Sequence, residues 1–189
     1  MKKFILIVAL FFAFSAVSLA QQPTGQLKVF YETIQGFDFR SGTPAFDIQD
    51  ESFHGGGFGF NYSLNRWFDL WTQTTFFSGV RQGSIDLKLI NQMQGLRAVA
   101  RSRGPINVYG KGGMGFTRHV FNVANFGEQV RFGTTFVVGG GVELKWTDAT
   151  LIFIEVNQNA MSLPDITGLD ARDKWDSNTG IALGLAFQF

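Results

Sequence analysis

The chain has 189 residues, of which 45% are hydrophobic and 16% are charged, and its formal net charge is +1. This length favours one domain, and the apolar content excludes an intrinsically disordered chain. The balanced charge leaves no basic footprint, so we expect no nucleic acid as a partner. Because the sequence contains no Cys, it excludes a disulfide scaffold, a thiolate zinc site, a cysteine nucleophile and a lipid anchor on cysteine.

Residues 1–20 have the features of a secretory signal peptide. Lys2 and Lys3 give a positive start, an apolar run follows, and Ser18 and Ala20 supply the small residues that precede a cleavage site. The apolar run is shorter than the ~20 residues that a membrane-spanning helix needs. We therefore expect this segment to be removed on export, and the rest of the chain to form one domain.

Residues 21–189 carry the two-residue period of β-strands. The last segment shows the period most clearly, because large apolar residues alternate with small or polar ones from Gly180 to Phe189. Eight segments follow the same pattern, at roughly 26–37, 54–64, 67–79, 86–101, 106–118, 134–146, 149–161 and 177–189.

The connections between these segments alternate in length, which predicts an up-and-down arrangement. With an even number of strands, the short turns and both termini then lie at one end, and the long connections lie at the other. The short turns are at 65–66, 102–105 and 147–148, and the longer ones at 38–53, 80–85, 119–133 and 162–176.

The faces of the strands favour a membrane barrel over a soluble barrel or sandwich. A soluble barrel would carry many charges on its outer face, whereas the less apolar face here is mostly Gly, Ala, Ser, Thr and Asn. Small side chains suit the inside of a narrow eight-stranded barrel. A sheet in lipid must close on itself, and tilted strands of ~9–11 residues span the bilayer. We therefore predict an all-β fold, a transmembrane eight-stranded antiparallel barrel with its large apolar residues outward.

Charged residues are scattered along the small-residue face. A base placed at the middle of the bilayer would cost ~2–4 kcal/mol, so we expect these side chains to face the lumen and to pair across it. The arrangement admits an ion-selective constriction or a structural plug, and the narrow lumen favours the plug. The predicted network comprises Arg97, Lys111, Glu143, Lys145 and Glu155, with Arg101 as a further candidate.

Large aromatic residues fall near the short turns. Such residues form girdles at the membrane interfaces of barrels, so we expect a girdle at the periplasmic rim. Its predicted members are Tyr62, Trp67, Phe68 and Trp146, with Phe189 at the end of the chain.

Four stretches give the chain its resemblance to a known family: GGGFGFNYSLNRWFDLW, GPINVYGKGGMGFTRH, VVGGGVELKW and GIALGLAFQF. The chain resembles the small outer-membrane β-barrels of the OmpA and OmpX type. The resemblance implies a place in the outer membrane of a Gram-negative-type cell envelope, in contact with outer-membrane lipids and lipopolysaccharide. It also implies that Phe187 and Phe189 belong to a C-terminal signal read by the barrel-assembly machinery. We expect no peptidoglycan-binding domain of the kind that follows the OmpA barrel.

The two histidines, His54 and His119, are candidate general bases of a lipid-modifying barrel. Barrels of the lipid A deacylase type present His and Ser two residues apart on a strand. Val120 and Phe121 follow His119, and Ser52 precedes His54 in the reverse order. We therefore expect two histidines at loop edges near the outer rim, no catalytic residue, no cofactor and no bound metal.

A barrel fold does not by itself name an activity. We expect a non-catalytic outer-membrane protein with a role in envelope integrity or surface interaction. The alternatives are a narrow passive pore and a lipid-modifying outer-membrane enzyme.

Overall fold

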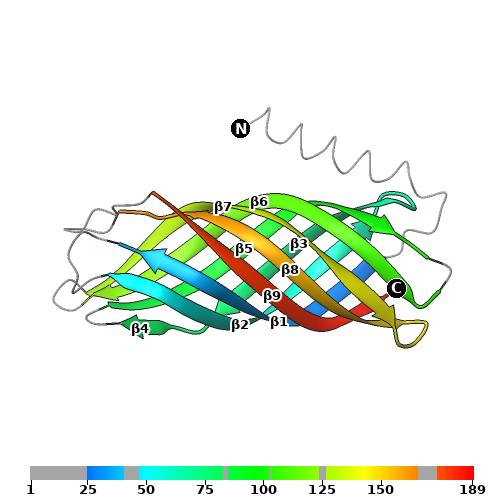
Figure 1. Cartoon of the computed structure of the whole chain (residues 1–189), viewed down its shortest axis with the longest axis horizontal. Helices are drawn as coiled ribbons and strands as arrows, with labels where there is room; N and C mark the ends of the chain where they lie inside the picture. The colour runs from blue at the N-terminus through cyan, green and yellow to red at the C-terminus, as the bar shows by residue number, and fades with distance from the viewer. Residues whose placement is uncertain (1–24, 41–46, 83–84, 103, 124–126, 166–173) are drawn as a thin grey trace, which may run out of the picture.

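The computed structural model describes residues 25–40, 47–82, 85–102, 104–123, 127–165 and 174–189. The predicted signal peptide at 1–20 lies outside the described residues. No helix long and apolar enough to cross a membrane occurs among the described residues. The strands wind around one axis (Figure 1) and are β1 (Gly25–Phe39), β2 (Ile48–Ser63), β3 (Phe68–Phe77), β4 (Val80–Gln82), β5 (Ile85–Ala100), β6 (Ile106–Val123), β7 (Gly127–Lys145), β8 (Thr150–Ser162) and β9 (Trp175–Gln188).

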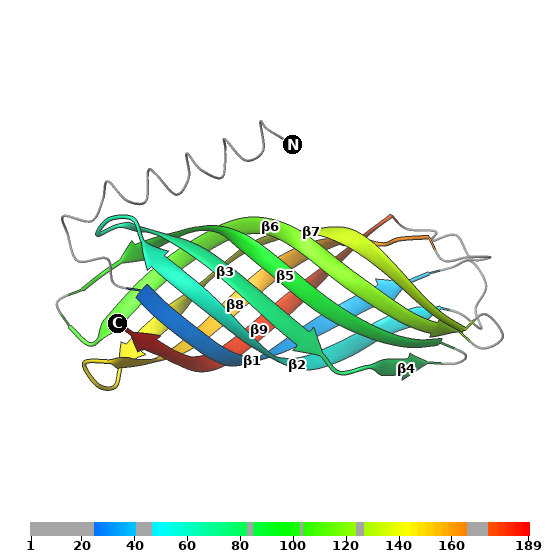
Figure 2. The same ribbon diagram turned by 180° about the vertical axis from the view of Figure 1, so that it is seen from behind.

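All pairs of neighbouring strands are antiparallel, and the first and last strands close the sheet. β1 pairs with β9 from Gln26 opposite Gln188 to Gln35 opposite Thr179. β3 and β4 both pair with β5, so they share one position in the wall, and β4 continues it beyond the end of β3 (Figure 2). The fold is therefore a closed eight-stranded antiparallel barrel, and the predicted fold class is confirmed.

At the end opposite the short turns, the strands are longer than predicted. The expectations of connections at 38–53 and 119–133 are wrong, because β1 continues to Phe39, β2 begins at Ile48, and β6 pairs with β7 as far as Val123. Polar residues alternate with apolar ones in these stretches, and the polar residues face outward, so the stretches resemble loops in composition although they form strands. The barrel therefore extends well beyond the length that a bilayer requires.

Two irregular residues direct side chains into this extension. The register between β1 and β2 shifts after Ile34, and Gly36 there has φ 74°, a conformation that glycine adopts without strain. On β2, Asp50 has φ 51°, and its N–H donates to Asp38 Oδ1 at 2.7 Å. Such bulges change which residues face inward. As a result Phe37 points into the barrel, as Ile34 does three residues earlier.

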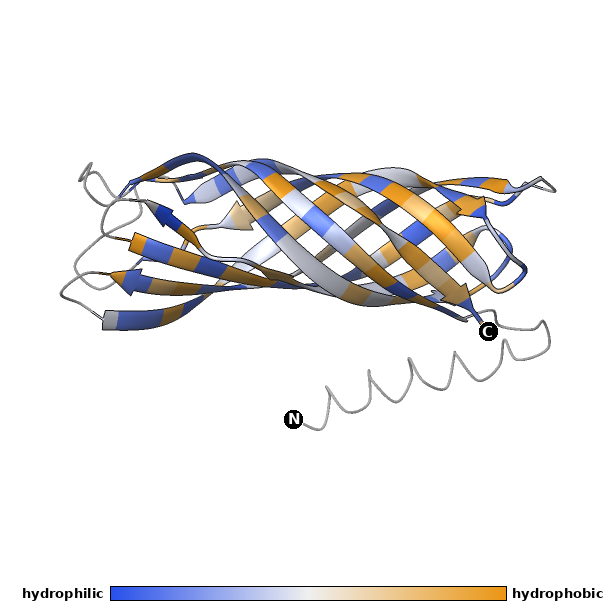
Figure 3. Ribbon diagram, turned by 90° about the horizontal axis from the view of Figure 1, so that it is seen from below, coloured by the Kyte–Doolittle hydropathy of each residue, from blue (hydrophilic) through white to orange (hydrophobic). Residues whose placement is uncertain are grey.

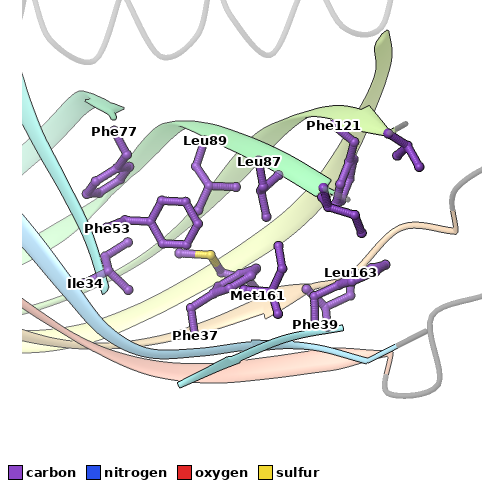
Figure 4. Packing of buried hydrophobic residues seen from close by; sticks show 13 residues of the cluster. Ile34, Phe37, Phe39, Phe53, Phe77, Leu87, Leu89, Phe121, Met161 and Leu163 are labelled. Atoms are coloured by element: carbon purple, nitrogen blue, oxygen red, sulfur yellow. The ribbon is translucent and has the colours of Figure 1, made fainter. Parts of the chain in front are cut away.

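The interior of the barrel has two parts of opposite polarity. Near the short turns, the inward side chains are mostly polar or charged. At the other end, an apolar core packs across the lumen from strands on different sides (Figure 4). None of its members is more than 5% exposed: Ile34, Phe37, Phe39, Ile48, Phe53, Phe77, Ile85, Leu87, Leu89, Phe121, Val123, Met161 and Leu163.

The outer wall shows the complementary pattern. Near the short turns it exposes large apolar side chains such as Leu183, Val138 and Phe116, far more than a soluble monomer leaves in contact with water. Beyond them β5 turns Lys88 and Gln92 outward. Apolar and polar residues alternate along the ribbons in Figure 3. The prediction of outward apolar faces therefore holds for the part near the short turns and is wrong for the extension, where the apolar side chains are inside.

Candidate functional site: the ion network of the lumen

Four residues of the predicted network lie buried in the lumen, where the charged side chains form two clusters. The first cluster is centred on Arg97 of β5. Its guanidinium donates Nη1–H and Nη2–H to the two carboxylate oxygens of Glu143 on β7, at 2.6 and 2.9 Å. The Arg97 Nε also lies 3.3 Å from Asp69 Oδ2 on β3. Asp69 in turn accepts a hydrogen bond from Arg101 at 2.6 Å. The bidentate arrangement fixes the guanidinium in one plane.

The second cluster surrounds Glu155 on β8. Lys111 on β6 donates to Glu155 Oε1 at 2.5 Å, and the Tyr109 hydroxyl donates to Oε2 at 2.8 Å. Asn157 donates a further hydrogen bond to Oε1 at 2.8 Å. The ammonium of Lys28 on β1 lies 3.5 Å from Oε2. The carboxylate thus has hydrogen-bond donors at both oxygens, as a buried charge requires.

Tyr109 joins the two clusters. Its hydroxyl is bound to Glu155 in the second cluster, and the Arg97 guanidinium of the first lies 4.2 Å from the centre of its ring. The ring has room because Gly141 faces it, and a Cβ added at Gly141 would lie 2.8 Å from Tyr109 Cζ. The glycines of β7 therefore serve the packing of the lumen.

The network links six wall positions of the barrel and fills the space between them. Its charged and phenolic side chains come from β1, β3, β5, β6, β7 and β8. The space left beside Lys28, Trp71 and Lys111 is about 10 Å³, which is about the volume that one water needs. Paired charges therefore fill the lumen at the level of the bilayer.

Lys145 does not join the network, and its assignment there is corrected. It is the last residue of β7, where the barrel opens to water, and its side chain is half exposed. Its ammonium lies 2.8 Å from Asp148 in the following turn, and this hydrogen bond lowers the pKa of the Asp148 carboxyl. Alternation places Lys145 on the inner face correctly, but it does not show where the lumen ends.

Two members of the network that form ion pairs are not predicted from the sequence. Lys28 and Asp69 lie on the first and third predicted segments, which contain no residue of the predicted network. Both stand between outward apolar neighbours, as in Phe68 and Leu70 around Asp69. That alternation is the signal that assigns both side chains to the lumen.

The two histidines lie within strands, so the expectation of loop-edge histidines is wrong. His54 on β2 faces outward, with its Nδ1 3.1 Å from the Thr33 hydroxyl, and its ring stacks on Tyr31. His119 on β6 is fully buried and stacks on Phe121 of the apolar core. Neither of its ring nitrogens has a hydrogen-bond partner of normal geometry among the described residues. A lipid substrate cannot reach His119 there.

His119 predicts a measurable sensitivity to acid. It follows Arg118, which faces outward beyond the apolar stretch of β6, so it lies outside the part of the strand that crosses the bilayer. Burial lowers the pKa of His119 to about 4. In the unfolded chain the histidine is protonated below about pH 6.5, whereas in the folded barrel it stays neutral down to about pH 4. The free energy of unfolding therefore decreases by roughly 3 kcal/mol as the pH falls from about 6.5 to about 4.

The variant His119→Leu should lose this acid-dependent step and be more stable at pH 7.5 by about 1–3 kcal/mol, because it removes two unsatisfied nitrogens from an apolar site. Urea unfolding in lipid vesicles at pH 7.5 and pH 4.5 measures both effects. His54→Leu is the control and should retain the step. Parallel pH profiles for His119→Leu and the wild type would contradict the assignment.

The predicted aromatic residues gather at the short-turn end. Trp67 and Phe68 flank the β2–β3 turn and Trp146 begins the β7–β8 turn, all three exposed. Tyr62 faces outward one strand position before the β2–β3 turn. Phe189 closes the seam of the barrel, since its N–H and C=O both bond with Gly25 at 3.0 Å.

A closed eight-stranded barrel with an apolar outer wall and paired charges in its lumen defines the class of outer-membrane β-barrel proteins. A family model described as the outer membrane protein β-barrel domain matches residues 6–189, and the chain belongs to this family. The resemblance predicted from the sequence is thereby confirmed, and the protein is placed in the outer membrane. No curated protein matches the sequence.

Solved structures share the fold at low sequence identity. Neisserial surface protein A (NspA) has a TM-score of 0.67 at 11% identity, over 88% of this chain and 97% of its own. Ail of Yersinia pestis, in complex with the heparin analogue sucrose octasulfate, has a TM-score of 0.57 at 16% identity, over 89% and 100%. The N-terminal barrel domain of Pseudomonas aeruginosa OprF has a TM-score of 0.54 at 12% identity, over 89% and 100%. At these identities the likeness shows the fold alone.

Proposed function

We propose that this protein is a non-catalytic, non-conducting outer-membrane barrel that acts at the cell surface, in envelope integrity or in surface interaction. The observation that carries the proposal is the double closure of the lumen. Charged pairs fill it at the level of the bilayer, and the apolar core beyond them excludes water from its own part of the interior. An ion that crosses the barrel would have to disrupt both the charged pairs and the apolar core.

The long extension supports a role outside the membrane. β6 and β7 have 18 and 19 residues, whereas ~9–11 residues span a bilayer. The extension has an apolar inside and outward polar residues, as a water-exposed barrel has. One structural neighbour carries the name attachment invasion locus protein, and a surface role of that kind is the one we propose here. We also propose that the signal peptide directs export, and that Phe187 and Phe189 belong to the signal for insertion into the outer membrane.

Planar-bilayer recording distinguishes this function from a passive pore. The purified barrel should give no stable conductance steps, and neither should the variant Glu143→Gln. A steady conductance that Glu143→Gln alters would support a pore through the lumen and refute the sealed barrel. A strain without the protein should gain sensitivity to detergents or lose surface adhesion, and the wild-type chain should restore either property.

A lipid-modifying enzyme would give a different experimental result. Overexpression would change the acylation of lipid A, and His119→Ala would abolish the change. We expect the acylation pattern to stay constant, because the only histidine of the inner face is enclosed by Phe121 and its apolar neighbours.

A further inference from the structure

The outer wall of the barrel carries two amide side chains inside its apolar zone. On β5 the outward face is uncharged over the eleven residues from Ala100 back to Ile90, and ~9–11 tilted residues span a bilayer. Gln94 lies near the middle of this stretch, and Gln92 lies two residues nearer the extracellular end. Both side chains are exposed on the outer face. In a single barrel both amides therefore meet hydrocarbon.

The side chains around Gln94 leave its amide unpaired. Its cross-strand partners are Thr72 on β3 and Met114 on β6, and the Thr72 hydroxyl already donates to the Met93 carbonyl at 3.2 Å. Within the part of the chain that the structure describes, no hydrogen bond reaches the amide of Gln92 or Gln94. An amide without a hydrogen bond is costly in hydrocarbon. A partner that brings hydrogen-bonding groups into the bilayer would remove this cost.

Small residues beside the two amides leave the wall open to close approach. Gly110 and Gly112 on β6 face outward, and a Cβ added at either would meet no atom closer than 3.8 Å. The packing of the barrel itself therefore does not require glycine at these positions, and a glycine within a strand often marks a place where another chain comes close. A hollow of about 480 Å³ lies in the same wall, where Ala98, Ala100 and Gly110 line it and Trp67 borders it.

We propose that this face of β5 and β6 is an interface between two copies of the barrel in the membrane. Two barrels inserted in the same direction are related by a two-fold axis along the membrane normal, so each residue lies at the depth of its own copy. The Gln94 amide donates through Nε2 and accepts through Oε1, and the second copy carries the same amide at the same depth. The two amides can therefore form reciprocal hydrogen bonds.

Both features of this face favour association in lipid. Polar side chains that bond between membrane-spanning segments, and small residues that permit close approach, are enriched at interfaces within membranes. Gln94 supplies the first feature, and Gly110 and Gly112 supply the second. The interface goes beyond the surface role proposed above and does not depend on the closure of the lumen.

Disulfide cross-linking in outer membranes tests the geometry, since the chain contains no Cys. Leu96→Cys places one thiol two residues from Gln94 on the outward face, where Leu96 is 54% exposed. Leu183→Cys is the matched control, because Leu183 is 56% exposed and β9 lies four strands from β5 in either direction around the wall. Oxidation should convert Leu96→Cys to a dimer of twice the mass of the chain and should leave Leu183→Cys monomeric.

Energy transfer between donor-labelled and acceptor-labelled barrels in lipid vesicles measures the affinity. Gln92→Leu/Gln94→Leu should associate about tenfold more weakly than the wild type, which corresponds to about 1.4 kcal/mol. Gln158→Leu makes the same exchange on the outer face of β8, away from the interface, and should associate as the wild type does. Gly110→Leu should also weaken association, because its side chain would occupy the hollow, while the gel mobility of the unboiled protein shows that the barrel is folded.

Three results would overturn the proposal. They are a wild type that stays monomeric at every ratio of protein to lipid, equal cross-linking of Leu96→Cys and Leu183→Cys, and unchanged association of Gln92→Leu/Gln94→Leu. A Leu96→Cys adduct with a mass other than twice that of the chain would identify a different protein as the occupant and would also refute self-association. Conductance through the barrel would leave all of these outcomes unchanged.

Discussion

Arg97→Ala should lower the free energy of unfolding by about 3–5 kcal/mol, since removal of one partner leaves the other charges buried and uncompensated. Arg97 is 1% exposed and supplies both hydrogen bonds to the Glu143 carboxylate, together with the ion pair to Asp69. It also covers the ring of Tyr109.

Equilibrium unfolding in urea with the protein in lipid vesicles, followed by tryptophan fluorescence, measures the loss. Arg40→Ala is the matched control, because Arg40 pairs with Asp38 at 3.2 Å while both side chains remain well exposed. An exposed pair contributes about 0–1 kcal/mol. Equal effects of the two substitutions would show that the buried network does not stabilise the barrel.

A second variant separates charge from packing. In Arg97→Met/Glu143→Leu both members of the bidentate pair are replaced by apolar side chains, and Asp69 keeps its hydrogen bond from Arg101. Replacement of a buried pair by apolar residues is often neutral or stabilising. The double variant should therefore recover most of the stability lost in Arg97→Ala, and a further loss would point to packing defects instead.

The sequence predicts the membrane half of this barrel well. Alternation alone places Arg97, Glu143 and Glu155 on the inner face, because each lies between outward apolar neighbours. Their partners follow less directly, since the period gives a face but no register. Only the pairing of strands shows that Arg97 meets Glu143, and that Lys145 lies beyond the end of the lumen.

The extension could not be predicted in the same way, because the apolar face changes sides along single strands. On β5, Leu96 faces outward, whereas Leu89 and Leu87 face inward. A two-residue period separates the two faces of a strand but does not show which face is inside. The outward assignment of apolar residues is correct near the short turns and does not apply to the extension. On β1 the bulge at Gly36 shifts the inward-facing residues from even to odd positions. This shift interrupts the alternation by which a strand is recognised in the sequence.

Leu185→Arg should cost about 2–4 kcal/mol, the penalty of an arginine on the lipid face at the middle of the bilayer. On β9 the outward face is apolar from Ile181 to Phe189, and Leu185 is its central residue. Its cross-strand partners are Val29 on β1 and Ile152 on β8, so the substitution places a charge between two apolar side chains.

Thr179→Arg is the matched control on the same strand and face. Thr179 lies ten residues from the terminal Phe189, near the outer boundary of the bilayer, where an arginine costs about 0–1 kcal/mol. Unfolding of both variants in the same vesicles should therefore show a loss for Leu185→Arg that exceeds the loss for Thr179→Arg by at least about 1 kcal/mol. A neutral Leu185→Arg would show that this outward face of β9 does not contact the hydrocarbon of the bilayer.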